Sequence, residues 1–302
     1  MSTRSRSLLF SSATGIAGVA LLAVLWEGYK ALGPAEGLRI GAVEGERGSG
    51  VMVLPRTDDV AMPHLIDMLV RLLEPVSSSA ADTPLWLAVV QAASLSLGIA
   101  LCGLAIGLVV GTVLAVAMQR VRIVESAVLP LVILSQTVPL IALAPLVRSW
   151  GARIEIGEFE WQNWMSVAVI AAYLAFFPIA VGMLRGLQSP SAVDVELMDS
   201  LASGWWSTLV RLRLPAAVPY LVPALKLAGA SAVVGTVVAE VSVGLPGGIG
   251  RMIMEFAGFV SSDPAKVWAP ITGALLLGLV VAGLVALAGL PLNRFRRTEL
   301  AS

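Results

Sequence analysis

The feature that most constrains this chain is a series of long apolar segments that contain almost no charged side chains. Residues 86–118 form one such run, with no Asp, Glu, Lys or Arg in it. About 20 apolar residues in a helix suffice to cross the hydrocarbon core of a bilayer, where only helices and closed barrels satisfy their own backbone. The sequence therefore predicts an all-α polytopic membrane protein with about six transmembrane helices. The predicted segments are 8–26, 86–118, 124–147, 164–187, 216–240 and 268–291.

The composition agrees with that prediction and excludes several classes of protein. Hydrophobic residues make up 57% of the 302 residues, and charged residues only 13%, against about 25% in an ordinary soluble domain. A soluble globular protein is therefore excluded. The formal net charge is +0, so there is no electrostatic basis for binding nucleic acid. Cys102 is the only cysteine; no intrachain disulfide can form, and we interpret it as a small buried apolar residue.

Basic residues gather at alternate ends of the segments, which sets the orientation because cytoplasmic loops are enriched in Lys and Arg. We expect both termini to lie in the cytoplasm. The first segment could be a signal peptide, but we expect an uncleaved helix, because no small-x-small cleavage site follows Trp26. The basic residues on the predicted inner side are Arg4, Arg6, Arg120, Arg122, Arg185, Arg211, Arg213, Arg294, Arg296 and Arg297.

The predicted organisation has four parts. Residues 1–26 are a cytoplasmic tail and first span, 27–85 an extracytoplasmic loop, 86–292 a five-helix core, and 293–302 a basic cytoplasmic tail. In the loop, the stretch from Gly33 to Gly50 is expected to be mobile. Apolar residues at helical spacing predict an amphipathic helix over 62–73, on which His64 is a surface residue. The glycines of 244–250 predict a tight turn, followed by a short re-entrant or surface helix, with a plain exposed loop as the alternative.

Residues 189–240 combine a short polar segment with an apolar run long enough to span. Ser189 is a good N-cap and Pro190 suits the first helical position. Asp194 and Glu196 then lie near the positive end of the helix, where carboxylates are favoured. The helix is too short and too polar to cross a membrane, and Arg211 and Arg213 place it on the cytoplasmic side. We therefore predict a cytoplasmic surface helix within 189–214 that leads into a membrane span.

This segment resembles the coupling segment of bacterial ABC importer permeases of the binding-protein-dependent type. The family motif is Glu-Ala-Ala-x-x-x-Gly, followed by a Trp and a Leu-Pro. Glu196 falls on its Glu, Ala202 on its Gly, Trp206 on its Trp, and Leu214-Pro215 on its Leu-Pro, while Leu197 and Met198 replace the two Ala residues. The resemblance covers most of 85–292 and is greatest to the nitrate/sulfonate/taurine branch. It implies the helical bundle of a type I ABC importer permease, in the inner (plasma) membrane of a bacterial cell.

The resemblance also implies the partners. A cytoplasmic ABC ATPase dimer would bind Ala192–Trp206, an extracytoplasmic solute-binding protein would deliver the solute, and a second permease copy would complete a homodimer in the lipid bilayer. Glu196 would make an electrostatic or capping contact, or else be a solvated acid. Trp206 would anchor the helix on the bundle, or else be an interfacial residue. The predicted coupling residues are Asp194, Glu196, Leu197, Met198, Asp199, Ala202, Gly204 and Trp206.

We expect no catalytic residue, cofactor or metal in this chain, and hence no enzyme. Lys30, Lys226 and Lys266 are the only lysines, and none belongs to a P-loop, so ATP hydrolysis is expected in a partner chain. Lys226 and Glu240 lie toward the ends of the fifth segment, where we interpret them as interfacial. Because the spans lack charged residues near their centres, we expect transport to be driven by a separate ATPase and not by an ion gradient. An ion-coupled secondary transporter or channel remains the alternative, and a membrane enzyme would need a cluster of reactive side chains that we do not find.

The solute pathway is expected between two copies of the bundle, lined by the third to fifth segments. Ser135, Gln136 and Thr137 form a polar cluster in the proline-rich third segment and are the candidate lining residues, unless they only satisfy each other and the kinked backbone. The branch suggests nitrate, alkyl sulfonates or taurine as the solute, with thiamine-precursor pyrimidines as the next candidates. Gly103, Gly107 and Gly111 repeat every four residues and predict close helix packing on one face.

Overall fold

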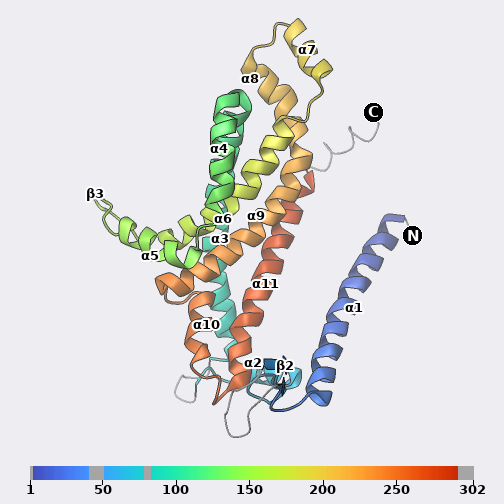
Figure 1. The fold of residues 1–302 in the computed structure, drawn as a ribbon, viewed down its shortest axis with the longest axis vertical. Helices are drawn as coiled ribbons and strands as arrows, with labels where there is room; N and C mark the ends of the chain where they lie inside the picture. Colours follow the sequence, from blue (N-terminus) through green and yellow to red (C-terminus); the bar gives the residue numbers. More distant parts are fainter. Residues whose placement is uncertain (1–2, 41–50, 78–82, 292–302) are drawn as a thin grey trace. The chain divides into compact units, whose positions relative to one another are not determined.

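The computed structural model describes residues 3–40, 51–77 and 83–291, and these are mostly helical (Figure 1). The predicted helical fold is confirmed, with two short antiparallel hairpins added in the loops. The helices are α1 (Thr3–Leu32), α2 (Leu65–Leu73), α3 (Leu85–Arg120), α4 (Arg122–Ser135), α5 (Leu140–Gly151), α6 (Asn163–Leu187), α7 (Ala192–Ser200), α8 (Trp205–Thr208), α9 (Leu214–Val243), α10 (Ile249–Ala257) and α11 (Pro264–Gly289), with a π-helical turn at Leu209–Arg213. The strands are β1 (Leu38–Ile40), β2 (Val51–Leu54), β3 (Glu155–Ile156) and β4 (Phe159–Glu160).

Within the described residues, four helices are long and apolar enough to cross a membrane: α3, α6, the continuous Trp205–Val243 and α11. Each coincides with a predicted segment. The pair α4 and α5 passes the same test together, as a broken span or a re-entrant loop. Helix α1 contains the predicted first segment, and its crossing of the membrane remains a prediction. The basic tail 293–302 and residues 41–50 of the glycine-rich stretch lie outside the described residues.

The third segment differs from the single interrupted span that we predicted over 124–147. The chain bends by 105° between α4 and α5. Pro130 and Pro145 lie inside the two helices, whereas Pro139 is the residue from which α5 starts. A proline lacks the N–H needed for the helical ladder and pushes the residue before it out of the helical region, so the break falls here. The segment is therefore two short helices joined by a sharp turn.

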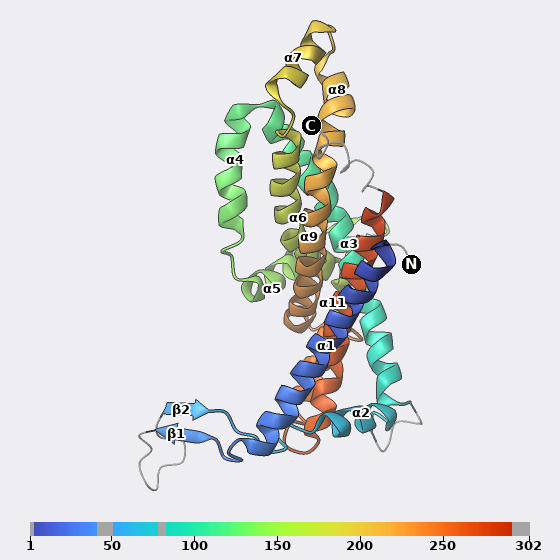
Figure 2. The same cartoon turned by 90° about the vertical axis from the view of Figure 1, so that its right-hand side faces the viewer.

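The chain divides into two compact units, and the larger contains residues 89–254 and 270–302. In this unit α6 and α9 run side by side, and α7 extends past their end (Figures 1 and 2). The predicted glycine face is confirmed on α3. A Cβ atom added to Gly103 would lie 2.5 Å from the Cβ atom of Ala171, and one added to Gly107 would lie 2.9 Å from that of Ala175. The absent side chains thus allow α3 and α6 into close contact.

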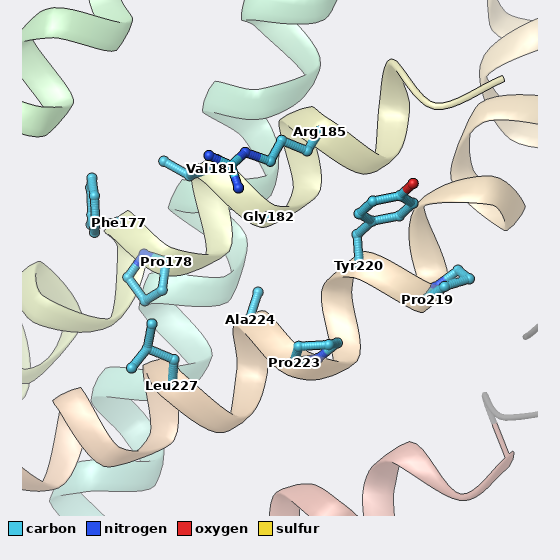
Figure 3. Close-up of a pocket in the computed structure, with 10 residues that line it drawn as sticks. All are labelled: Phe177, Pro178, Val181, Gly182, Arg185, Pro219, Tyr220, Pro223, Ala224 and Leu227. Atoms are coloured by element: carbon cyan, nitrogen blue, oxygen red, sulfur yellow. The ribbon is translucent and has the colours of Figure 1, made fainter. Parts of the chain in front are cut away.

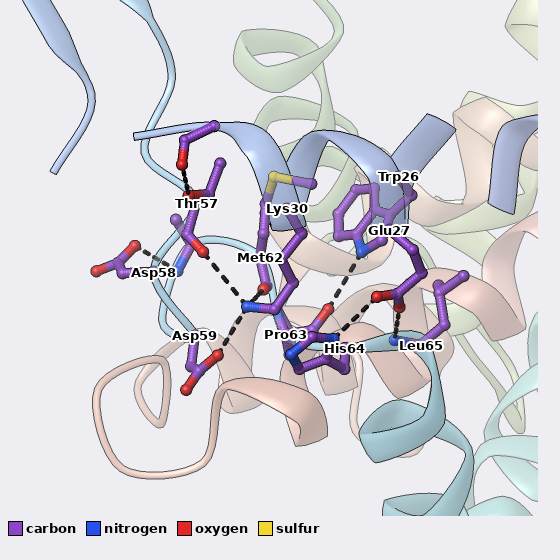
Figure 4. Close-up of polar contacts among 12 residues, drawn as sticks. Trp26, Glu27, Lys30, Thr57, Asp58, Asp59, Met62, Pro63, His64 and Leu65 are labelled. Carbon is purple, nitrogen blue, oxygen red and sulfur yellow. Dashed lines mark hydrogen bonds and ion pairs between the residues drawn. The ribbon is translucent and has the colours of Figure 1, made fainter. Parts of the chain in front are cut away.

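The smaller unit contains residues 1–88 and 255–269, and polar contacts fasten its loop to α1 (Figure 4). The Lys30 ammonium, whose side chain is 6% exposed, donates to Asp59 at 2.7 Å and to the Met62 carbonyl at 2.5 Å. The hydrogen bond and charge of Lys30 lower the pKa of the Asp59 carboxyl. His64 lies 2.9 Å from the Glu27 carboxylate, at a partly exposed position. The loop between α1 and α2 is therefore held by side chains of α1.

Candidate functional site

Helix α7, the predicted cytoplasmic surface helix, has its own start signal. Its N-cap is Ser191, not the predicted Ser189. The Ser191 hydroxyl accepts the backbone N–H of Asp194 at 3.2 Å, and the Asp194 carboxylate accepts the backbone N–H of Ser191 at 3.3 Å. This reciprocal capping box is available only to a residue with a carboxylate or amide three positions later, and Ser189 has Ala192 there. Asp194, a predicted coupling residue, therefore contributes to the helix start.

Helix α7 ends in a turn that places Ala202 in an unusual backbone conformation. The N–H of Ser203 donates to the Met198 carbonyl at 3.0 Å, and the N–H of Ala202 donates to the Asp199 carbonyl at 2.9 Å. This pattern is a Schellman motif, which requires the left-handed conformation at the residue after the C-cap. Ala202 has φ of 52° and is the one non-glycine residue with positive φ in the described part of the chain. Ala202 thus takes a conformation that glycine adopts at lower cost.

The side chains of α7 face outward, since none of its residues is buried. Val193, Leu197 and Leu201 are 73%, 58% and 67% exposed. They follow one another at intervals of four residues and so lie along one face of the helix. Glu196 is exposed, and among the described residues it has no hydrogen-bond or ion-pair partner. Helix α7 thus presents an apolar stripe with a carboxylate beside it. Neither the stripe nor the carboxylate is buried against the helical bundle.

The two tryptophans after α7 have opposite environments. Trp205 packs on the core cluster that includes Met118 and Leu209, and the guanidinium of Arg120 lies 4.2 Å from the centre of its ring. Trp206 is 71% exposed. The predicted anchoring role of Trp206 is therefore wrong, because Trp205 makes that contact. Gly204, the N-cap of α8, adjoins open space, with nothing within 4 Å of an added Cβ atom.

The polar cluster Ser135, Gln136 and Thr137 forms the bend between α4 and α5. The Ser135 hydroxyl donates to the Val132 carbonyl at 2.7 Å, and the Thr137 hydroxyl donates to the Leu134 carbonyl at 2.8 Å. The hydroxyl of Tyr173 on α6 donates to the Ser135 carbonyl. These contacts satisfy backbone groups that the bend releases. Gln136 is half-buried and its amide reaches only the Ser135 hydroxyl, at 3.4 Å.

The structure also shows a site that our sequence interpretation missed. Glu240 is completely buried, so its interpretation as an interfacial residue is wrong. One carboxyl oxygen accepts the Ser96 hydroxyl at 2.6 Å, and the other accepts the N–H of Gly250 at 2.7 Å. The Ser96 hydroxyl in turn accepts the N–H of Ile249 at 2.9 Å. We call these residues the Glu240 lock, since together they join α3 and α9 to the first turn of α10.

Nothing in the described ranges points to chemistry beyond these contacts. Within 3–40, 51–77 and 83–291, no three His, Cys, Asp or Glu side chains gather as metal ligands would. The arrangement instead combines a helical bundle with an outward-facing helix at one end of α9 and a buried polar lock at the other.

Comparison with known proteins identifies the family. Residues 103–290 match the family described as binding-protein-dependent transport system inner membrane component. The chain is 35% identical over 189 residues to the formylaminopyrimidine transport permease protein ThiX of Halalkalibacterium halodurans, covering 61% of this chain and 69% of that protein. It is 27% identical to the riboflavin transport system permease protein RibX of Chloroflexus aurantiacus, covering 57% of this chain and 58% of that protein.

A third relative comes from the predicted branch. The taurine transport system permease protein TauC of Escherichia coli is 26% identical over 177 residues, which cover 58% of this chain and 57% of that protein. The alignments therefore span roughly three fifths of the relatives' lengths. The predicted resemblance to ABC importer permeases of the nitrate/sulfonate/taurine-like branch is confirmed. The chain belongs to the family of binding-protein-dependent transport system inner membrane components.

Proposed function

We propose that this chain is the permease subunit of an ATP-driven importer and that α7 is its contact with a separate ATPase dimer. The observation that carries the proposal is the exposed apolar stripe of Val193, Leu197 and Leu201 on a helix with no buried residue. Exposed apolar patches with a polar rim are typical of protein–protein interfaces. Glu196 and Asp199 supply that rim, and Trp206 extends the apolar surface.

In this proposal ATP-driven closure of two ATPases moves two copies of α7, one from each half of a permease homodimer. The movement reaches the bundle through Trp205, which packs against the core, and through the π-helical turn that continues directly into α9. Rigid-body rocking of the two bundles would then expose the pathway alternately to each side. The division into 1–26, 27–85, 86–292 and 293–302 remains part of this proposal, with both termini in the cytoplasm.

The proposed solute is delivered by an extracytoplasmic binding protein. The names of these relatives refer to transport of formylaminopyrimidine, riboflavin and taurine. We therefore propose a small polar or anionic organic solute, with taurine, other sulfonates and thiamine-precursor pyrimidines as first candidates and nitrate as the inorganic one. Ser135, Gln136 and Thr137 remain proposed lining residues, with Gln136 as the member whose side chain has the weakest protein contact.

The direct test is the loss of ATPase binding when the stripe becomes polar. We expect Leu197→Ser, and more strongly Val193→Ser with Leu197→Ser, to lose the ATPase on co-purification from native membranes. Phe159→Ser is the matched control, because Phe159 is also exposed, at 46%, but lies in the hairpin β3–β4. Equal recovery of the ATPase with all variants would refute the proposed contact.

An ion-coupled transporter is the second candidate, and buried Glu240 is the observation that favours it, since such proteins place acids inside their spans. Both carboxyl oxygens, however, accept hydrogen bonds from the protein, as expected for a structural acid. Uptake into vesicles that hold a proton or sodium gradient but no ATP separates the two. Gradient-driven uptake would replace our proposal by the alternative.

A further inference from the structure

A groove of about 370 Å³ lies between α6 and α9, within the larger unit (Figure 3). Its size is in the range of small-molecule sites. Phe177 and Pro178 form one wall from α6, and Pro223 and Leu227 form the other from α9. The prolines fix the backbone on both sides, because their ring removes one torsional freedom. The groove is therefore a mostly apolar hollow with stiff walls.

The floor of the groove is where the two helices touch. A Cβ atom added to Gly182 would lie 2.5 Å from the Cβ atom of Ala224, so the helices approach as closely as their backbones allow. Gly182 and Ala224 both line the groove. The hollow is thus built by the pairing of a glycine with an alanine.

The lining of the groove includes two polar side chains, which point away from each other (Figure 3). Arg185, on α6, is the only charged lining residue and places its guanidinium beside Val181, whereas Tyr220, on α9, directs its hydroxyl away from it. Across the described residues, neither the Arg185 guanidinium nor the Tyr220 hydroxyl has a hydrogen-bond or ion-pair partner. Two other arginines of the unit have partners: Arg213 donates to the Leu187 carbonyl at 2.9 Å, and Arg120 lies over the Trp205 ring. A guanidinium beside an open hollow can hold a planar or tetrahedral oxyanion through two parallel N–H groups.

We infer that this groove binds the transported solute and selects a small organic anion, with the oxyanion on Arg185 and the apolar part between the proline walls. The identity of the occupant as cargo rests on the proposed function. Arg185 belongs to the arginines that predict the cytoplasmic side, so the groove serves the release end of the pathway. The site lies on the fourth and fifth predicted segments and uses none of the residues 135–137.

The test measures binding without transport. In full-length protein carrying Cys102→Ala and Val181→Cys, the introduced thiol lies in the groove lining, and its rate of reaction with a maleimide reports occupancy. Butanesulfonate is the probe, and butanesulfonamide is its uncharged analogue of the same shape. We expect butanesulfonate to slow labelling and butanesulfonamide to leave it unchanged. Arg185→Gln should abolish this protection, Arg185→Lys should retain part of it, and the control Arg211→Gln should retain all of it.

Four outcomes would overturn the inference. Equal protection by the sulfonamide, or full protection in Arg185→Gln, would show that charge does not select the ligand. Labelling slowed by anionic phospholipid in nanodiscs, with no further effect of butanesulfonate, would identify a lipid headgroup as the occupant. ATP-driven uptake, measured in parallel, distinguishes failure of the groove inference from failure of the proposed permease function. Uptake without protection of the thiol would reject the groove as the solute site and leave the permease function intact. If butanesulfonate protects the thiol but no ATPase co-purifies with the chain, the proposed function is rejected and the groove remains an anion-binding site.

Discussion

Helices α7 and α10 are both nine residues long, and they precede and follow α9 in the sequence. They are held in opposite ways. Helix α7 buries no residue and is fixed by its own capping box and Schellman turn, whereas the first turn of α10 is joined to α3 and α9 by the Glu240 lock. A helix with only local caps keeps its side chains free for another protein. A helix held by buried hydrogen bonds moves only with its neighbours.

The largest expected loss of stability comes from a substitution that introduces a steric clash into the Glu240 lock. A Cβ atom added to Gly248 would lie 2.4 Å from Cδ of Glu240, so the carboxyl would have to shift away from the Ser96 hydroxyl and the Gly250 N–H that it binds. We expect Gly248→Ala to destabilise the protein by about 3 kcal/mol or more, seen as a lower melting temperature by size-exclusion chromatography in detergent. Gly278→Ala in α11, where nothing lies within 4 Å, is the control. If Gly248→Ala had the melting temperature of the wild type, the Glu240 lock would have to accommodate an added methyl group without loss of stability.

The next effect removes the carboxyl itself. Glu240→Ala leaves the Ser96 hydroxyl and the Gly250 N–H without their acceptor in a buried site, at a cost of about 1–3 kcal/mol for each group. Glu240→Gln keeps the shape and one acceptor oxygen, so we expect it to cost about 1 kcal/mol. Thermal melting of the two variants gives the comparison. Equal stability of Glu240→Ala and wild type would mean that the hydrogen bonds do not hold α10.

The same reasoning on α7 predicts a smaller and strictly local effect. Ser191→Ala removes the hydroxyl that accepts the Asp194 N–H, which costs a helix about 1 kcal/mol. Because α7 contributes nothing to the core, we expect faster hydrogen exchange of its own amides, by about fivefold, and an unchanged global melting temperature. Ser189→Ala is the matched control, since Ser189 lies outside the capping box. A fall in global stability with Ser191→Ala would contradict the independence of α7.

These two helices also show what the sequence can predict. The spans follow from uninterrupted apolar runs, and the capping box of α7 is visible as Ser191-Ala192-Val193-Asp194; choosing Ser189 overlooked the requirement for a carboxylate three residues later. The Glu240 lock has no local signal. Ser96 is 144 residues away from Glu240, and only packing of α3 against α9 brings them together. Distance from the end of an apolar run is therefore a poor guide to whether an acid is solvated.

The smallest effect has the opposite sign and tests the end of α7. Ala202 occupies the left-handed region, with φ of 52°, which costs a residue with a Cβ atom about 1–2 kcal/mol. Glycine avoids that cost, but it loses more conformational entropy on folding than alanine does, which costs about 0.5–1 kcal/mol. We therefore expect Ala202→Gly to slow hydrogen exchange at Leu201 and Ser203 by a small factor, whereas Ser200→Gly, inside the helix, should speed it. Faster exchange in Ala202→Gly would mean that the turn is set by contacts with a partner and not by its own backbone.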